Sequence, residues 1–322
     1  MTRRSRSKRN FAESAEPPVA TALVIGYGSI GQRHVRILGE LGWTTSVVSS
    51  QDTADLPIYN NVHDAMDGCQ PSYVVVASPT AFHSRDVHAV LDSGYQGPIL
   101  IEKPLFSTAE SIARLSKSNV FVGYNLRFLK VIQRLRELIS PTDVISIHVY
   151  NGEYLPDWRP QRDYRATSSA LRSLGGGVLR DLSHEIDFLH YLIGAPNSVS
   201  AVTTSSGTLE IETEDTVSAV FEHPCGAITT LALSYLDRIR RREIHITTRL
   251  NSVKANLLNG RVSIGNREED WSSERDDTFR EMHRDILSAS PRISCSLSEG
   301  LDVVRTIDMI ESSGTTRKWV NR

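Results

Sequence analysis

The sequence predicts an α/β protein in two parts, an N-terminal doubly wound parallel sheet and a C-terminal α/β domain with a mostly antiparallel open sheet. Three observations predict this fold class. Apolar strand-like runs alternate with helix-like segments from residue 20 to 123, which is typical of a parallel sheet. β-rich runs separated by short turns follow in the second part, which favours antiparallel pairing. The 322 residues also exceed the roughly 250–300 at which a single hydrophobic core stops growing.

The first part, residues 20–123, contains five runs that are apolar along their whole length. Such strands are expected where helices cover a parallel sheet on both faces. The predicted strands cover residues 21–26, 44–49, 73–78, 98–103 and 120–124. The helices between them are expected at 29–41, about 81–91 and about 108–117, from the spacing of their apolar residues.

The second part, residues 124–322, changes character. A helix at about 126–138, a strand at 144–150 and a polar, aromatic loop at 151–173 come first. A glycine triplet then opens a predicted helix at about 178–192. The remaining predicted strands cover 198–204, 216–222, 227–235, 243–248 and 252–258, and two helices close the chain at about 274–288 and 298–312.

Composition excludes several classes of function. The formal net charge of −2 gives no overall attraction to nucleic acid, and no apolar run approaches the roughly 20 residues of a membrane helix. Cys69, Cys225 and Cys295 are odd in number and far apart, so neither a disulfide framework nor a metal site is expected. We therefore expect a cytoplasmic protein that binds neither nucleic acid nor membrane.

Residues 1–19 form a distinct N-terminal segment, with five basic residues among the first nine. The segment has no apolar stretch of the kind a secretory signal needs. Its composition has some likeness to a transit peptide or a nucleic-acid arm, but nothing in it can pack, so we expect a solvated disordered tail.

A glycine-rich turn between the first strand and the first helix indicates dinucleotide binding. Its G-x-G-x-x-G pattern comprises Gly26, Tyr27, Gly28, Ser29, Ile30 and Gly31. In a Rossmann unit the first glycine permits the tight turn, the second lets the backbone approach the pyrophosphate, and the third lets helix and strand pack closely. The pyrophosphate then faces the free N–H groups at the helix N-terminus.

The end of the second predicted strand bears on the choice between NAD and NADP. An acidic residue at this place usually holds the ribose of NAD. Here Ser49 and Ser50 occupy the place, and Asp52 comes two or three positions beyond it. Neither serine would repel a 2′-phosphate, although no arginine is nearby to bind one. The sequence therefore predicts NAD or NADP, with a slight preference for NADP.

Three further segments, together with the glycine-rich turn, carry a family resemblance. They are Ala77-Ser78-Pro79-Thr80 with His83, then Glu102-Lys103-Pro104, then Gly175-Gly176-Gly177-Val178-Leu179-Arg180-Asp181 with His184 and Asp187. Taken in this order, they resemble the Gfo/Idh/MocA oxidoreductases, which include glucose–fructose oxidoreductase and inositol dehydrogenases. The likeness runs from about residue 20 to 320.

The resemblance implies a sugar-like substrate and a set of site residues. Members of this family usually oxidise or reduce a hydroxyl or ketone on sugars, inositols or nucleotide-linked sugars. Lys103, commonly followed by a cis proline in the family, corresponds to the lysine beside nicotinamide and substrate, and Asp181 and His184 to the other catalytic positions. Many members have three residues between this aspartate and histidine, whereas two separate them here. This difference leaves the role of Asp181 open.

The chemistry of these side chains suits hydride transfer. A histidine is suited to move the proton on the carbinol oxygen at neutral pH, and a lysine can hydrogen-bond the developing alkoxide or act as the acid/base itself. On one continuous helix, Asp181 or Asp187 would lie near His184 and orient it. Ser78, Pro79 and Thr80 follow the third strand, where backbone approaches the nicotinamide ribose, and Glu102 is also expected beside the cofactor. His83 is expected to be structural or to contact the cofactor side as a spacer.

The 151–173 loop is predicted to bind substrate. Trp158, Arg159, Arg162 and Tyr164 combine arginines, which hold phosphate or carboxylate, with aromatic rings, which stack on sugars or bases. A subunit contact is the alternative for this loop. W-R-P-x-R-D-Y resembles a subgroup of the family associated with bacterial surface sugars. Asn125 and Arg127, at the domain junction, are predicted as substrate contacts or interdomain bonds.

Two other functions stay open at this point. One is a catalytically idle NAD(P)-binding sensor or scaffold, and the other is an NAD-dependent glycosidase of the same fold. An open sheet with one uncovered face usually pairs with another copy, so a homo-oligomer, a dimer or tetramer, is expected.

Overall fold

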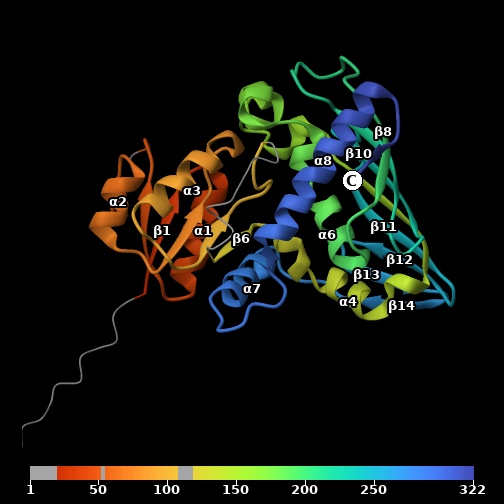
Figure 1. Cartoon of the computed structure of the whole chain (residues 1–322), viewed down its shortest axis with the longest axis horizontal. Coiled ribbons are helices and arrows are strands. Elements are labelled where there is room, and N and C mark those ends of the chain that lie inside the picture. Colours follow the sequence, from red (N-terminus) through yellow and green to blue (C-terminus); the bar gives the residue numbers. More distant parts are fainter. Residues whose placement is uncertain (1–19, 52–54, 108–118) are drawn as a thin grey trace, which may run out of the picture.

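The computed structural model describes residues 20–51, 55–107 and 119–322 (Figure 1). Within them lie a seven-stranded sheet and a nine-stranded sheet, each with helices, so the predicted α/β fold class is confirmed. The 1–19 tail and the helix predicted at about 108–117 lie outside the described residues. No helix in the described part of the chain is long and apolar enough to cross a membrane.

The first sheet is the predicted parallel sheet. Its order is β15-β6-β5-β4-β1-β2-β3, and all its pairs are parallel except β15 with β6. The first six strands in chain order are β1 (Thr21–Ile25), β2 (Thr44–Val48), β3 (Ile58–Tyr59), β4 (Tyr73–Val76), β5 (Ile99–Ile101) and β6 (Val120–Val122). Its helices are α1 (Ser29–Glu40), α2 (Val62–Cys69) and α3 (His83–Asp92), which follows the 3₁₀ turn η1 (Thr80–Phe82).

The chain returns to the first sheet after completing the second. β15 (Cys295–Ser296) pairs antiparallel with β6, and α7 (Asp277–Ile286) packs against α1. A single boundary near residue 123 therefore marks where the chain first leaves the parallel sheet, while two later elements pack back onto it.

The second sheet is mostly antiparallel, in the order β14-β13-β12-β11-β7-β10-β9-β8-β16, with β7 and β10 parallel. Its strands are β7 (Val144–Gly152), β8 (Ser198–Thr204), β9 (Thr216–Glu222), β10 (Ile228–Ser234), β11 (Arg241–Thr248), β12 (Ser252–Asn256), β13 (Arg261–Ile264), β14 (Arg267–Asp270) and β16 (Val320–Asn321).

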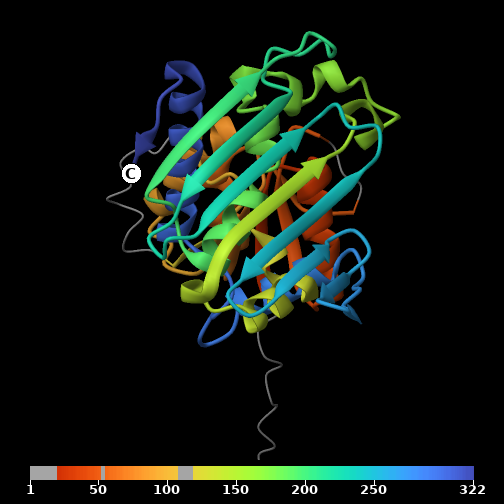
Figure 2. The same ribbon diagram turned by 90° about the vertical axis from the view of Figure 1, so that its right-hand side faces the viewer.

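In the described part of the chain, helices cover one face of the second sheet, and Figure 2 shows the other face uncovered. The covering elements include α4 (Lys130–Leu138), α5 (Val178–Asp181), α6 (His184–Ile193) and α8 (Leu297–Thr316). Short 3₁₀ turns connect the rest: η3 (Asn125–Phe128), η4 (Pro141–Asp143), η5 (Leu155–Trp158), η6 (Tyr164–Ala166), η7 (Ser168–Ala170) and η8 (Arg172–Leu174).

Two predicted helices are each broken in the structure. The 126–138 helix divides into η3 and α4 at Leu129, whose backbone is extended. The 178–192 helix divides into α5 and α6 at Leu182 and Ser183, so the prediction of one continuous helix was wrong. The carbonyl of Asp181 accepts a hydrogen bond from the Lys103 side chain, while Glu185 N–H bonds Leu182 instead.

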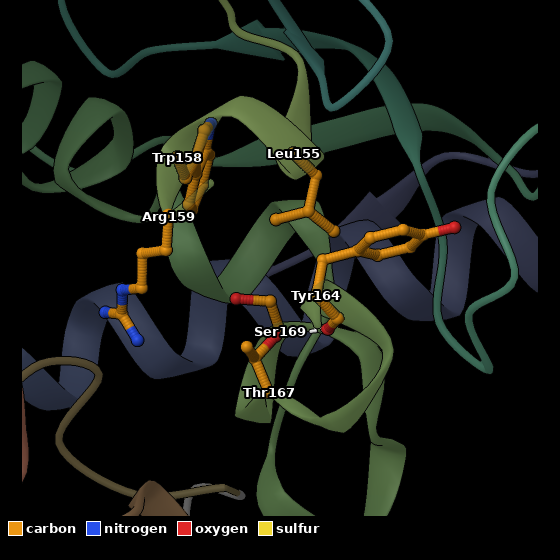
Figure 3. A pocket seen from close by; sticks show the side chains of 6 residues that line it. All are labelled: Leu155, Trp158, Arg159, Tyr164, Thr167 and Ser169. Atoms are coloured by element: carbon orange, nitrogen blue, oxygen red, sulfur yellow. Dashed lines mark hydrogen bonds between the residues drawn. The ribbon is translucent and has the colours of Figure 1, made fainter. Parts of the chain in front are cut away.

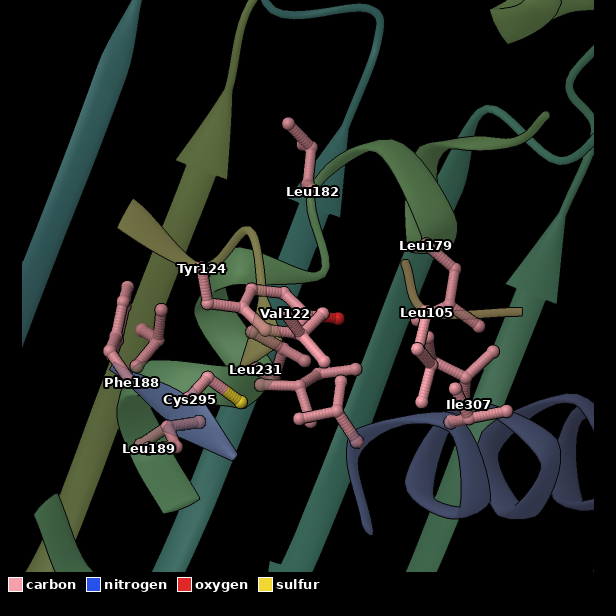
Figure 4. Packing of buried hydrophobic residues seen from close by; sticks show 14 of the residues in the cluster. Leu105, Val122, Tyr124, Leu179, Leu182, Phe188, Leu189, Leu231, Cys295 and Ile307 are labelled. Atoms are coloured by element: carbon pink, nitrogen blue, oxygen red, sulfur yellow. The ribbon is translucent and has the colours of Figure 1, made fainter. Parts of the chain in front are cut away.

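One hydrophobic cluster crosses from the first sheet to the second. Leu105 and Val122 come from the parallel sheet, Leu179 and Phe188 from α5 and α6, and Ile307 from α8 (Figure 4). All five side chains are buried. The two parts of the chain therefore share a packed core where the turn after β5 meets α5.

Candidate active site

The glycine-rich turn needs glycine at two positions for steric reasons. Gly26 has φ +96°, and a Cβ there would lie 2.7 Å from the backbone N of Ser78. A Cβ on Gly31 would lie 2.0 Å from the carbonyl oxygen of Gly26. No L side chain fits at either contact, as expected for the tight turn and the close helix–strand packing.

Gly28 is different, because a Cβ there would have no neighbour within 4 Å. Gly28 is the N-cap of α1, no side chain caps the helix, and its first turn carries no acidic residue. The N–H groups at this helix end thus border open space at the positive end of the helix dipole. The turn fits the diphosphate of a dinucleotide.

The end of β2 carries the two predicted serines. Ser49 Oγ accepts a hydrogen bond from the backbone N–H of Gln51 at 2.9 Å, and Ser50 is exposed. Asp52 lies outside the described residues. Among residues 49–51 no carboxylate stands at this strand end.

His83 joins the turns that follow β4 and β5. Its Nε2 lies 2.8 Å from the carbonyl oxygen of Ser78, and its Nδ1 lies 3.2 and 3.1 Å from those of Pro104 and Leu105. The ring is buried, and burial lowers its pKa. His83 therefore holds together the two turns predicted to face the cofactor, in the structural role that the sequence left open for it. The Oγ of Ser78 is buried without a hydrogen-bond partner, while Pro79 is exposed and Thr80 half-buried.

Lys103 connects the first part of the chain with the second. It precedes a cis peptide bond to Pro104, and its Nζ donates a hydrogen bond to the main-chain carbonyl of Asp181 at 2.6 Å. Glu102 beside it is buried, with its carboxylate bonded to His34 and to the N–H of Lys103. Both carboxylate oxygens of Glu102 are therefore engaged in hydrogen bonds within the protein, one with His34 and one with Lys103.

The carboxylate of Asp181 accepts hydrogen bonds from two hydroxyl groups. Tyr235 Oη donates to Asp181 Oδ2 at 2.7 Å, and Ser169 Oγ donates to the same oxygen. Tyr235 is fully buried, and burial together with Asp181 raises its pKa well above its usual range. Tyr235 is therefore a neutral hydrogen-bond donor.

His184 lies three residues after Asp181, the hydrogen-bond partner of Lys103, and has no carboxylate partner among the described residues. Its Nδ1 is buried and has no hydrogen-bond partner, and its ring packs edge-on against Tyr124 at 5.6 Å between centroids. Burial, then the charges of Lys103 and Arg242, lower the pKa of His184 well below its usual value. The expectation that Asp181 or Asp187 orients this imidazole was wrong, because α5 and α6 are separate and both carboxylates bond other residues.

Two family models match the chain. One, described as an oxidoreductase family with an NAD-binding Rossmann fold, matches residues 20–120, and the other, the GFO/IDH/MocA C-terminal domain, matches residues 132–253. Both match at the places where the structure has the parallel sheet and the open sheet. The chain belongs to the GFO/IDH/MocA oxidoreductase family.

Curated relatives of this GFO/IDH/MocA protein align over part of their length. Inositol 2-dehydrogenase of Rhodococcus erythropolis is 28% identical over 229 residues, covering 63% of this chain and 62% of that protein. Levoglucosan dehydrogenase of Pseudarthrobacter phenanthrenivorans is 27% identical over 140 residues, covering 41% of this chain and 35% of that protein. The chain thus matches less than two thirds of the length of either relative.

Solved structures share the fold over nearly the whole chain. Levoglucosan dehydrogenase in complex with NADH has a TM-score of 0.80 at 16% identity, covering 94% of this chain and 99% of that one. The WlbA dehydrogenase of Bordetella pertussis, in complex with NADH and UDP-GlcNAcA, has a TM-score of 0.79 at 17% identity, again covering 94% and 99%.

Two residues predicted as substrate contacts of this GFO/IDH/MocA protein are buried in pairs with other side chains. Arg127 is 1% exposed and binds Asp187 through both Nε and Nη2, at 3.0 and 2.7 Å, and Glu299 at 2.8 Å. Asn125 donates to Thr278 of α7 at 2.6 Å. This placement supports the alternative role of structural bonds for both residues.

The predicted substrate loop forms a small pocket beside Asp181. Leu155, Trp158, Arg159, Tyr164, Thr167 and Ser169 line it (Figure 3). Ser169, one of the residues that line the pocket, donates a hydrogen bond to the Asp181 carboxylate. Arg162, the fourth predicted loop residue, is exposed and does not line this pocket.

Sequence reasoning missed three polar residues of this site: Tyr235, Ser169 and Tyr124. Tyr235 continues the alternation of buried Leu231 and Leu233, so its inward direction was readable from the strand pattern. No sequence signal paired it with Asp181, because the two residues approach each other only through packing of β10 against α5.

Proposed function

We propose that this protein is an NAD(P)-dependent oxidoreductase that transfers a hydride between nicotinamide and a hydroxyl or ketone carbon of a sugar, inositol or nucleotide-linked sugar. One observation carries the proposal. The Lys103 ammonium, on the turn at the carboxyl end of the parallel sheet, contacts Asp181 of the second domain, and its charge acts on His184, three residues further along the chain. Ligands of open α/β sheets bind at this edge.

The glycine-rich turn would hold the dinucleotide. The N–H groups around Gly28 at the start of α1 would bind the diphosphate, and Ser49 and Ser50 would lie near the adenosine ribose. The buried, unpartnered Oγ of Ser78 supports a polar contact with the cofactor from the turn after β4. When bound, the nicotinamide supplies or accepts the hydride.

Lys103 and His184 have different tasks in this proposal. Lys103 Nζ donates a hydrogen bond to the substrate oxygen and stabilises negative charge that develops there. His184 is neutral at pH 7, because burial and the charges of Lys103 and Arg242 oppose its protonation. It serves as a neutral hydrogen-bond partner that orients the hydroxyl, and Lys103 moves the proton. Asp181, held by Tyr235 and Ser169, keeps the α5 carbonyl in place for Lys103.

Arg159 favours a substrate that carries a negative group. It lines the pocket beside Trp158 and Tyr164, and within the described residues no carboxylate pairs with its guanidinium. By contrast, nearby Arg165 binds Asp163 and Glu210. An arginine beside aromatic rings suits the phosphate or carboxylate of an anionic or nucleotide-linked sugar. The WlbA neighbour is a complex with a substance of that kind, UDP-GlcNAcA.

The slight preference for NADP is retained as part of the proposal. It rests on Ser49 and Ser50, which leave no carboxylate among residues 49–51 to repel a 2′-phosphate. Two of the neighbouring structures, GenD2 and levoglucosan dehydrogenase, are complexes with NAD and NADH. A fluorescence titration with NADH and NADPH decides between the two, and tighter binding of NADH contradicts the preference.

A panel of inositols, sugars and UDP-sugars, followed through nicotinamide absorbance, tests the reaction itself. We expect turnover of at least one compound, with anionic compounds preferred. Cofactor binding without any absorbance change across the panel would instead indicate the sensor or scaffold, and sugar cleavage without net redox change would indicate the glycosidase.

We also infer a cytoplasmic homo-oligomer. Figure 2 shows one face of the second sheet uncovered. On its strands the apolar Val202 and Ile228 are exposed and Val220 is half-buried, opposite the buried residues of β8, β9 and β10. A second copy of the same face would cover them. Light scattering of the protein and of Ile228→Lys tests this, with a monomer expected for the variant. The free cysteines Cys69, Cys225 and Cys295 support a reducing compartment.

A further inference from the structure

Four buried polar side chains form a chain of hydrogen bonds that ends at the backbone N–H of Lys103. Tyr73 Oη lies 3.0 Å from His283 Nδ1, and His283 Nε2 lies 2.9 Å from His34 Nδ1. His34 Nε2 lies 2.9 Å from Glu102 Oε1, and Glu102 Oε2 accepts the backbone N–H of Lys103 at 3.1 Å. The four side chains come from β4, α7, α1 and the end of β5, and all four are buried.

The donors in this chain can all point in one direction. Although burial opposes ionisation, the hydrogen bond from His34 and the charge of Lys103 lower the pKa of Glu102, so its carboxylate accepts. His34 then donates from Nε2, and a neutral His34 ring must accept at Nδ1. His283 therefore donates from Nε2 and accepts at Nδ1 from the Tyr73 hydroxyl. Every polar atom in the chain has one partner in this arrangement.

The Glu102 carboxylate has little freedom at the end of this chain. Both of its oxygens are engaged, and a Cβ on Gly123 would lie 2.8 Å from Oε1, so only glycine leaves room for it there. Because Oε2 accepts the N–H of the next residue, the position of the carboxylate determines that of the Lys103 backbone. The rings of Phe279 and His283 pack edge-on against His34 and keep it in place.

We propose that Tyr73, His283 and His34 are positioning residues for Lys103, which act through Glu102 by a one-directional series of hydrogen bonds. The inference rests on the proposed function, since it gives Lys103 a task at the substrate. It assigns Glu102, expected from the sequence at the cofactor, to holding the turn after β5. It also explains why α7 packs back onto α1, because His283 supplies the middle of the chain.

Two charged groups act on this chain from the neighbouring elements. Arg33 on α1 and Lys103 interact electrostatically with Glu102. The two cations favour an ionised Glu102, which accepts the hydrogen bond from His34.

Histidine tautomers measured by ¹⁵N NMR on the intact protein test the direction without any assay of activity. We expect neutral Nε2–H tautomers for both His34 and His283. An Nδ1–H tautomer at His283, or an imidazolium at His34 at neutral pH, overturns the proposed direction. If no sugar is turned over at all, the proposed function fails, yet the tautomers still test the chain.

The substitution Tyr73→Phe tests the positioning. It removes one hydroxyl and keeps the ring that packs against His283 at 5.6 Å. We expect kcat to fall about 10- to 100-fold, with the cofactor Kd unchanged and a new tautomer mixture at His283. Tyr95→Phe is the matched control, because it removes a tyrosine hydroxyl bonded to Pro98 outside the chain. Unchanged kcat and tautomers in Tyr73→Phe, with only a lower Tm, show a purely structural role and overturn the proposal.

Discussion

Lys103 Nζ donates a hydrogen bond to the main-chain carbonyl oxygen of Asp181 at 2.6 Å, across the junction of the two sheets. This bond takes the carbonyl that a continuous helix would use, and α5 ends at the same residue. α6 then begins at His184, whose buried Nδ1 has no hydrogen-bond partner in the described part of the chain. The hydrogen bond from Lys103 therefore accounts both for the end of α5 at Asp181 and for the start of α6 at His184.

Lys103→Met is expected to abolish most turnover and to spare cofactor binding. The variant keeps the length of the side chain and removes its charge and hydrogen-bond donors, so kcat should fall about 10²- to 10⁴-fold. Stopped-flow kinetics and NAD(P)H fluorescence measure the two effects. Lys130→Met, at an exposed lysine outside the site, is the control and should keep full activity. Equal losses of binding and turnover in Lys103→Met would contradict the assigned role.

Tyr235→Phe is expected to lower kcat about tenfold, because Asp181 loses a hydrogen bond to its charged carboxylate. A double-mutant cycle with Asp181→Asn isolates this effect. If the hydroxyl acts through Asp181, the second substitution adds little to the first. Additive losses of kcat/KM would show that Tyr235 acts independently of Asp181.

Gly28→Ala and Gly31→Ala should separate cofactor binding from folding. A Cβ on Gly28 meets no atom within 4 Å, so this variant should keep its Tm and lose about tenfold or more in NAD(P)H affinity. A Cβ on Gly31 would lie 2.0 Å from the Gly26 carbonyl oxygen, so that variant should be destabilised by several kcal/mol or fail to fold. Thermal unfolding and cofactor titration measure both. Unchanged affinity in Gly28→Ala would argue against a diphosphate at this turn.

Arg127→Met is expected to destabilise the protein by about 3–5 kcal/mol, because it leaves Asp187 buried without its partner. The double variant Arg127→Met/Asp187→Leu should recover most of the loss, since both charges are then removed. Urea unfolding gives the free energies. If Arg127→Met instead raised KM for the sugar with unchanged stability, Arg127 would be a substrate contact after all.

The free energy of unfolding should fall as the pH decreases from about 6.5 to about 4. Burial lowers the pKa of His223 to about 4 and that of His190 to about 3. Below its ordinary pKa of about 6.5 each histidine binds a proton in the unfolded chain but not in the folded one. The stability they contribute is complete above pH 6.5 and is lost at up to about 1.4 kcal/mol per pH unit for each histidine.

Urea unfolding of His223→Gln across this pH window measures the contribution of one ring. We expect a shallower pH slope for this variant than for the parent protein. The exposed His63→Gln is the matched control, and its slope should equal that of the parent. Parallel slopes for all three proteins would exclude His223 as a source of the acid sensitivity.

Most secondary-structure elements could be predicted because their patterns are local. Strands such as 198–204 and 216–222 agree with the structure at both ends, since their buried residues alternate and turns bound them. The short strands β3, β13, β14, β15 and β16 escaped prediction. They depend on pairing with neighbours, which leaves little trace in two to four residues.

The sequence by itself determined the two-sheet α/β fold and the glycine-rich turn, because backbone sterics and repeating apolar patterns act between near neighbours, and its family resemblance made Lys103 a candidate. Only the tertiary structure decided which polar groups pair. It placed Asp181 with Tyr235, Arg127 with Asp187, Glu102 with His34, and His34 with His283. Buried polar atoms must be satisfied by whatever groups packing brings within about 3 Å, and that choice is made by segments far apart in the chain.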